Sequence, residues 1–300
     1  MTAGPEGPPH LGGGNQPTSP SGGSGVSDLK ARVLSAIVLA PIVLAIVWIG
    51  SWPFAVLAAA AAAILIGEWS GISRSRYVDA AVAVAGTCLF AAVLAFAAGY
   101  GTVAGVLVLA GALAGQALAW PNDPARLFGT GVFYAGLPML ALVALRSDPA
   151  YGLAAIIFLL IVVWTTDIGA YFAGRAMGGP KLAPRISPKK TWSGAIGGLV
   201  AAVVASALFV WFLLPADLLP DTLLPLILLA AVLSAVSQCG DLLESALKRR
   251  FDVKDSSRLI PGHGGLMDRV DALIVAAVAG GLVGVARGGA DAAGAGLLLW

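Results

Sequence analysis

Long apolar runs separated by short polar segments fill the chain of 300 residues from position 33 onward. A helix needs about 20 mainly apolar residues to cross the hydrocarbon core of a bilayer. The sequence therefore predicts an all-α, polytopic integral membrane protein. We expect about nine transmembrane helices, over residues 33–49, 53–72, 78–98, 102–120, 127–145, 152–173, 192–214, 223–247 and 270–286.

The composition supports this class of protein, because 58% of the residues are hydrophobic and only 11% are charged. So few polar side chains cannot cover the surface of a soluble protein of this size. Residues 1–29 are instead rich in Gly, Pro and Ser, and we expect them to form a disordered tail. We assign residues 30–150 to N-terminal transmembrane helices. Residues 151–300 form a C-terminal transmembrane catalytic region with two basic loops.

The distribution of Lys and Arg predicts the orientation of the helices, because both residues concentrate in short loops on the cytoplasmic side. With the N-terminus inside, all 18 Lys and Arg residues except Arg146 and Arg287 fall on cytoplasmic segments. We therefore expect a protein of the cell (inner) membrane whose N-terminal tail and two basic loops are cytoplasmic. The net charge of +2 gives no reason to expect nucleic acid as a partner.

The first basic loop follows the sixth expected helix and reads GRAMGGPKLAPRISPKKTWSG. Ammonium groups and backbone amides in such a loop, rich in Gly and Pro, can converge on phosphate oxygens. Two simpler interpretations stay open: a positive-inside signal that meets lipid headgroups, and capping of the next helix by Ser187 to Thr191. Asp167, late in the sixth helix, favours a binding site because topology does not require a carboxylate there.

The second basic loop joins the last two expected helices and carries the densest charge of the chain. The spacing of Asp241, Ser245 and Lys248 places all three on one face of the eighth helix. Asp268 and Asp271 lie at the start of the ninth helix, where negative charge is favourable. Since the two helices are antiparallel neighbours, Asp241 and Asp268 can meet and hold Mg²⁺, which prefers a few oxygen ligands together with phosphates.

Ion pairing is the alternative to metal binding for these aspartates, because ion-pair networks are common at membrane boundaries. The candidate pairs are Asp241 with Lys248 or Arg249, and Asp268 with Arg269 or Arg258. Two further residues stay open between roles. His263 stands between glycines and can hydrogen-bond a phosphate or a backbone group rather than act as a general base. Glu68, late in the second helix, has either a functional role or a contact with headgroups near Arg74.

Cationic loops with carboxylates, and without a nucleophile activated by a base, are typical of nucleotidyl or phosphoryl transfer. Such reactions depend on positioning and on neutralisation of charge by a metal ion and by cationic side chains. A phosphomonoester that is already ionised near neutral pH can attack without a strong base. The absence of a catalytic triad is therefore compatible with catalysis.

Both loops match long motifs of one known family. The pattern S-x-L-K-R, four residues, K-D, then P-x-H-G-G and D-R-x-D is met by Ser245, Lys248, Arg249, Lys254, Asp255, Ser257, Ile260, Pro261, His263, Gly264, Gly265, Asp268, Arg269 and Asp271. The pattern D-x-x-A-Y, later S-P-x-K-T-x-E-G, is met by Asp167, Ala170, Tyr171, Ser187, Pro188, Lys190, Thr191 and Gly194. It departs at Ser193, where we expect Glu. The chain thereby resembles the phosphatidate cytidylyltransferases, also called CDP-diacylglycerol synthases.

This resemblance implies that CTP and phosphatidate give CDP-diacylglycerol and pyrophosphate in phospholipid biosynthesis. It also implies a homodimer in membrane lipid that uses Mg²⁺, with room for a second, monovalent cation. Asp241 and Asp268 would be catalytic residues and metal ligands, and Lys248 and Arg249 would be catalytic cations that neutralise phosphates. The expected substrate-binding residues are Asp167, Ser187, Lys189, Lys190, Thr191, Ser245, Lys254, Asp255, His263, Arg269 and Asp271.

Three other classes of membrane protein fit the sequence less well. A CTP-dependent lipid kinase needs a base for a neutral hydroxyl, and the intact motif disfavours it. A CDP-alcohol phosphotransferase should carry a D-G-x-x-A-R stretch, but the chain contains no Asp-Gly pair. A secondary transporter should show internal repeats and charges at the membrane midplane, whereas the charges here lie towards one face.

Overall fold

The computed structural model describes residues 24–73, 79–120, 127–213, 219–257, 259–260 and 264–300, with the side chains of the first helix described from Ile37. The described helices and strands are α1 (Ser24–Ile49), α2 (Ser51–Ile72), α3 (Asp79–Ala97), α4 (Gly101–Ala119), α5 (Phe128–Ser147), α6 (Gly152–Met177), β1 (Lys181–Ala183), β2 (Ser187–Thr191), α7 (Trp192–Leu213), α8 (Leu219–Arg250), α9 (Met267–Gly288) and α10 (Ala293–Leu298).

Among the described residues, eight helices are long and apolar enough to cross a membrane, namely α2 to α9. They correspond to the second to ninth expected spans, so the prediction of an all-α polytopic membrane protein is confirmed. The first expected span lies in α1, whose described apolar part is the shorter segment Ile37–Ile49. This helix begins at Ser24, inside the segment that we expected to be disordered, and residues 1–23 lie outside the described part of the chain.

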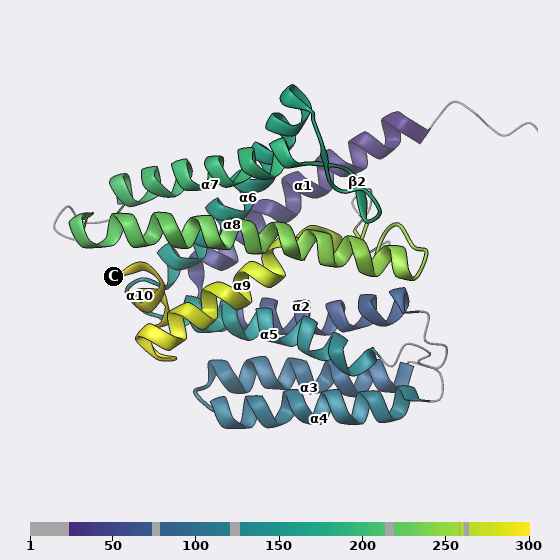
Figure 1. Cartoon of the computed structure of the whole chain (residues 1–300). Coiled ribbons are helices and arrows are strands. Elements are labelled where there is room, and N and C mark those ends of the chain that lie inside the picture. Colours follow the sequence, from purple (N-terminus) through teal and green to yellow (C-terminus); the bar gives the residue numbers. More distant parts are fainter. Residues whose placement is uncertain (1–23, 74–78, 121–126, 214–218, 258, 261–263) are drawn as a thin grey trace, which may run out of the picture.

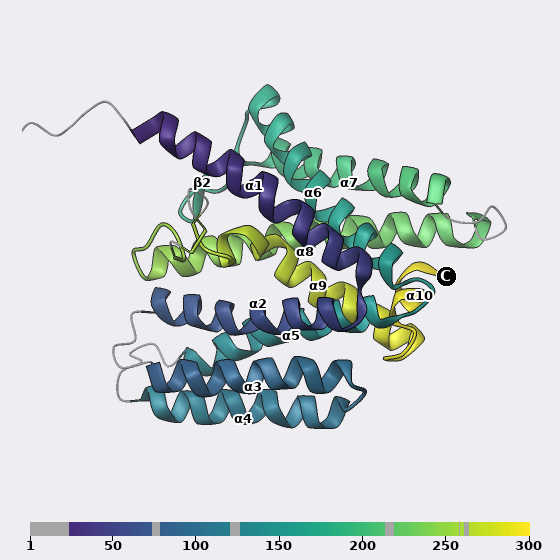
Figure 2. The ribbon, with the colours of Figure 1, turned by 180° about the vertical axis from the view of Figure 1, so that it is seen from behind.

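The helices form two groups with α9 between them (Figure 1). The paired helices α3 and α4 pack with α2 and α5 on one side, and α6, α7 and α8 pack together on the other. Helix α9 contacts α5 of the first group and α8 of the second. Helix α1 runs obliquely across the far face of the molecule, where few of its residues pack against the other helices (Figure 2). Helix α5 also contacts α6 and α10, so α9 is the main link between the two groups but not the single one.

Small residues bring α6 and α7 close together. A Cβ atom on Gly198 would lie 2.6 Å from the carbonyl oxygen of Thr166, and one on Gly197 would collide with Ala173. The Thr166 hydroxyl also donates a hydrogen bond of 2.8 Å to Ser234 Oγ, which ties α6 to α8. This packing fixes the three helices that carry most of the candidate site.

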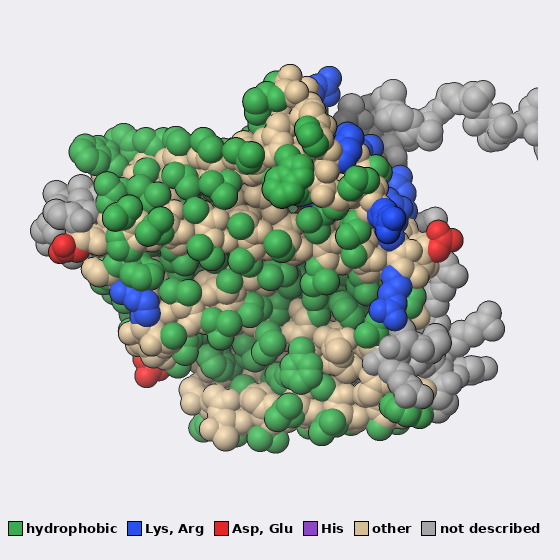
Figure 3. Space-filling view, viewed as in Figure 1, with side chains coloured by type: hydrophobic (Ala, Val, Ile, Leu, Met, Phe, Trp, Pro, Cys, Tyr) green, Lys and Arg blue, Asp and Glu red, His purple; other side chains and the backbone are tan. Residues whose placement is uncertain are grey.

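The connection between α6 and α7 is a β-hairpin, which the sequence did not indicate. Strands β1 and β2 are antiparallel, with Lys181 opposite Thr191 and Ala183 opposite Ser187. Thr191 Oγ1 accepts a hydrogen bond from Gly194 N, so the predicted capping of the following helix is confirmed at this residue. We call the end formed by β1, β2, the C-terminus of α8 and the N-terminus of α9 the basic end. Most Lys and Arg side chains visible in Figure 3 gather there.

Candidate active site

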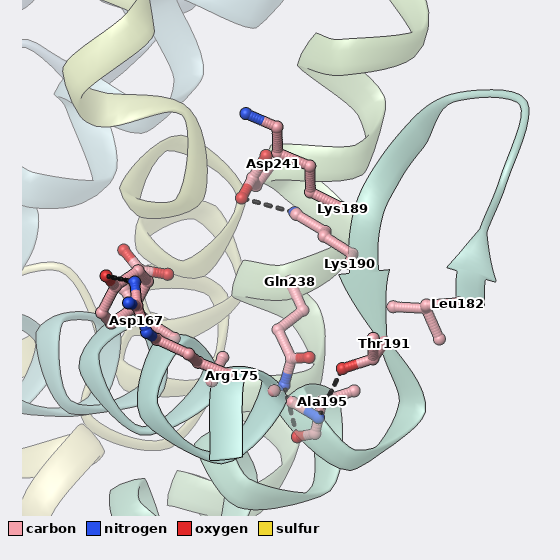
Figure 4. A pocket seen from close by; sticks show the side chains of 13 residues that line it. Asp167, Arg175, Leu182, Lys189, Lys190, Thr191, Ala195, Gln238 and Asp241 are labelled. Atoms are coloured by element: carbon pink, nitrogen blue, oxygen red, sulfur yellow. Dashed lines mark hydrogen bonds and ion pairs between the residues drawn. The ribbon is translucent and has the colours of Figure 1, made fainter. Parts of the chain in front are cut away.

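A pocket of about 450 Å³ opens at the basic end between α6, the hairpin and α8 (Figure 4). It brings together five residues that we predicted from separate segments: Asp167, Lys189, Lys190, Thr191 and Asp241. The other lining residues are Ala170, Tyr171, Gly174, Arg175, Leu182, Gly194, Ala195 and Gln238. The pocket therefore combines cationic and anionic side chains at the end of an apolar helical bundle.

Asp241 is the carboxylate that α8 contributes to the pocket wall. Its Oδ2 atom lies 2.5 Å from Lys190 Nζ, and Ser245 Oγ lies 3.5 Å from its other oxygen. The Asp241 and Lys190 side chains are 29% and 27% exposed, so a ligand can reach both. Asp167 and Asp271, from α6 and α9, are within electrostatic reach of Asp241. Such a concentration of negative charge favours a bound cation.

Lys248 lies between two carboxylates about two turns after Asp241 along α8. Its Nζ atom is 2.9 Å from Glu244 Oε2 and 2.8 Å from Asp268 Oδ1. The ion pair of Asp241 with Lys248, one of the alternatives that the sequence left open, is therefore not formed. The long side chain turns instead towards Glu244, which precedes it by one helical turn and is only 2% exposed. A buried carboxylate attracts the nearest cation strongly, because water screens it poorly.

Asp268 organises the loop between α8 and α9. In addition to Lys248, its carboxylate accepts hydrogen bonds from Ser256 N and Ser256 Oγ, both 3.0 Å, and from Gly265 N, 2.9 Å. The predicted ion pairing of the two aspartates is thus found with other partners, since Asp241 binds Lys190 and Asp268 binds Lys248. The structure brings these two pairs to the same end of adjacent helices.

Glu68, whose role the sequence left open, lies in the protein interior and is 6% exposed. Its Oε1 atom accepts hydrogen bonds from Ser257 Oγ at 2.6 Å and Leu266 N at 2.8 Å. Its Oε2 atom accepts a hydrogen bond from Met267 N at 2.7 Å and lies 3.1 Å from Ser256 Oγ, whose single hydrogen is shared with Asp268. The interpretation as a contact with headgroups is therefore wrong, because the carboxylate faces the loop that holds Asp268.

The other predicted residues that the structure describes do not line this pocket. Arg249 Nε donates a hydrogen bond of 3.5 Å to the carbonyl of Ile186, at the turn of the hairpin. Lys254, Asp255 and Arg269 have exposed side chains. Ser187 and Asp271 are partly buried, and His263 lies outside the described residues. The expected roles of these residues in binding substrate stay predictions.

Glu244, Gln238 and Ser256 of the site were not among the predicted residues. Glu244 could have been found from its spacing of four residues before Lys248, which places both on one helical face. Gln238 could have been noted as a polar residue in an apolar span, and its amide donates to the Ala195 carbonyl at 3.3 Å. Ser256 gave no such signal, because its contact with Glu68 joins segments that are far apart in the sequence.

Ser193 occupies the position where the family motif led us to expect Glu. Its hydroxyl donates to the carbonyl of Gly178, the residue after α6, and lies 3.0 Å from Thr191 Oγ1. The short side chain therefore fastens the end of α6 to the start of α7. It holds the hairpin that carries Lys190 in place without lining the described wall of the pocket.

Comparison with known proteins relates this geometry to a family. The model of the cytidylyltransferase family matches residues 30–283, which include α2, the pocket and the loop between α8 and α9. The chain belongs to this family. Glu68, Asp241 and Asp268 therefore all lie inside the part that defines a cytidylyltransferase.

Curated relatives match the same part of this cytidylyltransferase. A protein of Brucella suis biovar 1 (strain 1330) is 43% identical over 84% of this chain and 92% of its own length. Relatives from Haemophilus influenzae and Bacillus subtilis are 36% and 33% identical over 83% and 82% of this chain, and 96% and 94% of their own lengths. Each of the three is named phosphatidate cytidylyltransferase.

Proposed function

We propose that this chain is a phosphatidate cytidylyltransferase, which converts CTP and phosphatidate into CDP-diacylglycerol and pyrophosphate. The observation that carries the proposal is the pocket at the basic end, where Lys189 and Lys190 of the hairpin face Asp241 at the boundary of an apolar bundle. A nucleotide and a lipid phosphate can meet there while the acyl chains stay in lipid. The names of the relatives support this choice of substrates.

In the proposed reaction, an oxygen of the lipid phosphate attacks the α-phosphorus of CTP. A new P–O bond forms, the bond between the α-phosphorus and the bridging oxygen breaks, and pyrophosphate leaves with the electron pair. The lipid phosphate is already ionised, so no side chain has to remove a proton. Lys190 and Lys248 neutralise phosphate charge, and their carboxylate partners hold the ammonium groups in position before substrate arrives.

Oxygen ligands for Mg²⁺ are available at the pocket. Among the described residues, no group of three or more His, Cys, Asp or Glu side chains is arranged to hold a metal ion. Mg²⁺ often uses one or two carboxylates and takes its other ligands from phosphates and water. Asp241 fits this role, because it is exposed to the pocket. Asp268 fits as a second ligand only if Lys248 leaves its carboxylate for a substrate phosphate. Bound Mg²⁺ would neutralise phosphate charge.

The proposal includes a location and an assembly. We place the basic end on the cytoplasmic face of the inner membrane, because CTP is a cytoplasmic solute and the basic residues concentrate there. The homodimer rests on the family resemblance. A second, monovalent cation remains part of the proposal on the family resemblance alone.

The test is release of pyrophosphate by the purified protein in detergent, with CTP, phosphatidate and Mg²⁺ each omitted in turn. We expect turnover only when all three are present, because the nucleotide, the lipid phosphate and the metal each contribute to the transition state. Turnover without phosphatidate would contradict the proposal. Formation of CDP from CTP with a lipid alcohol, and none of CDP-diacylglycerol, would favour a lipid kinase instead.

A further inference from the structure

Glu68 supplies the cap that α9 lacks in its own sequence. The first amides of a helix have no partner inside the helix, and Leu266, the residue before α9, makes no side-chain hydrogen bond to them. The carboxylate of Glu68, from α2, accepts hydrogen bonds from the amides of Leu266 and Met267 instead. Negative charge is favourable at this end of a helix. A residue of the N-terminal half thus fixes the start of the helix that carries Asp268.

The same carboxylate reaches Asp268 through a single serine. The hydroxyl of Ser256 lies 3.1 Å from Glu68 Oε2 and 3.0 Å from Asp268 Oδ2, and Ser256 is 8% exposed. Asp268 in turn binds Lys248. A continuous set of contacts therefore runs from Glu68 through Ser256 and Asp268 to the ammonium group at the site.

The backbone of Gly265 packs directly against these groups. A Cβ atom on Gly265 would lie 2.7 Å from Glu68 Oε1 and would collide with Ser256 Oγ. The backbone of this glycine is therefore seated directly against the carboxylate. Its amide donates to Asp268 on the other side, so one short segment touches both acidic residues.

We propose that Glu68 is a positioning residue of the transferase. It fixes the segment around Ser256 and the start of α9, so that Asp268 holds Lys248 where the phosphates bind, and it makes no contact with substrate itself. This inference rests on the proposed cytidylyltransferase activity. It assigns a role to a carboxylate that the reaction scheme does not use.

The decisive variant is Glu68→Gln, tested in the full-length protein with Mg²⁺, CTP and phosphatidate. A carboxamide has one oxygen that accepts hydrogen bonds. Its NH₂ group would face a main-chain N–H, and neither of these two groups can accept a hydrogen bond from the other. We expect kcat to fall at least about tenfold, with the KM for CTP changing much less, because Lys248 is misplaced while the Lys190 side of the pocket is intact. Glu68→Asp, which keeps the charge, should recover part of kcat.

Asp148→Asn is the matched control for stability. Asp148 is 3% exposed and accepts hydrogen bonds from the amides of Ala150, Tyr151 and Ala295 at the opposite end of the molecule. The control should lower the unfolding temperature and leave kcat unchanged per folded molecule. An unchanged kcat in Glu68→Gln, or a loss no larger than in Asp148→Asn, would overturn the proposal.

Two further measurements separate positioning from general damage. If Glu68 acts through Ser256, the loss of kcat in Glu68→Gln combined with Ser256→Ala should be smaller than the product of the single losses; independent losses would count against it. If Glu68→Gln does not fold, Ser257→Ala removes one bond to the carboxylate, and an unchanged kcat there would contradict the proposal.

Hydrogen exchange of residues 264–267 provides a readout that needs no turnover. Exchange should be faster in Glu68→Gln than in the wild type, and equal rates would overturn the proposal. A wild-type protein that shows no turnover would argue against the proposed function, whereas equal exchange rates would argue against the role of Glu68.

Discussion

Each of the two lysines at the site is held by carboxylates, and the two arrangements differ in burial. Lys190 and Asp241 form a pair that is open to the pocket. Lys248 is 16% exposed and is held between Glu244 and Asp268, which are almost completely buried. A phosphate can displace the open pair at low cost, because water already solvates both groups. The ammonium group of Lys248 is instead held in one fixed direction by its two buried partners.

We predict that Asp241→Asn abolishes turnover in protein that still folds. The substitution removes the negative charge that is available to a metal ion at the pocket, and groups that stabilise charge in the transition state are typically worth about a hundredfold or more in rate. The measurement is pyrophosphate release over a range of Mg²⁺ concentrations.

Asp252→Asn is the control for this variant. It removes an exposed carboxylate at the same end of the molecule, and its φ of 54° is a conformation that Asn adopts readily. We expect normal turnover in the control. Full activity in Asp241→Asn would show that this residue is not required for metal binding.

At the scale of the elements, the site depends on close packing between helices rather than on any single helix. Helix α6 carries Asp167, α7 follows the hairpin that carries Lys190, and the glycines between the two helices let their backbones meet. In lipid, such close approach replaces the hydrophobic effect as a source of helix association. The width of the pocket therefore follows from the small residues at this interface.

We predict that Gly198→Leu destabilises the protein by about 1–3 kcal/mol, because a large side chain must push α7 away from α6. Turnover should also fall, since the two walls of the pocket move apart. The measurements are the thermal unfolding temperature in detergent and the rate of pyrophosphate release. Val200→Leu is the control: Val200 is 52% exposed on the same helix, so both properties should stay at wild-type values. Equal stability of the two variants would contradict the packing argument.

At the scale of the whole molecule, the N-terminal and C-terminal halves are linked at the basic end. The contacts of Glu68 reach from α2 to the start of α9, and α9 itself packs on α5 and α8. The basic side chains gather at this same end (Figure 3). A single face of the membrane therefore carries the pocket, the hairpin and the link between the halves.

We predict that this face is cytoplasmic. The experiment uses a variant without Cys88 and Cys239. A cysteine in place of Asp252 then reports on the basic end, and a cysteine in place of Tyr100, between α3 and α4, reports on the opposite end. A maleimide that does not cross membranes should label Tyr100→Cys in intact cells, and should label Asp252→Cys only after the cells are permeabilised. The reverse pattern would contradict the orientation taken from Lys and Arg.

The sequence by itself determined the class of fold and most of the charged residues of the pocket. Spans of about 20 apolar residues leave a chain no stable alternative to membrane helices, because backbone groups in lipid must bond within the segment. The motifs around Asp167, Lys190 and Asp241 likewise indicated the residues that meet in the pocket. The hairpin was not predicted, because three prolines and several glycines in that loop are as typical of an irregular connection as of a hairpin.

Only the tertiary structure decided which charges pair. Spacing along α8 placed Lys248 with Asp241, but a long side chain on a helix reaches neighbours on either side, and the buried Glu244 and Asp268 lie on the side that it takes. The partners of Glu68 are nearly 200 residues away in the sequence. Local patterns contain no information about such a contact, because it exists only once α2 and α9 have packed together.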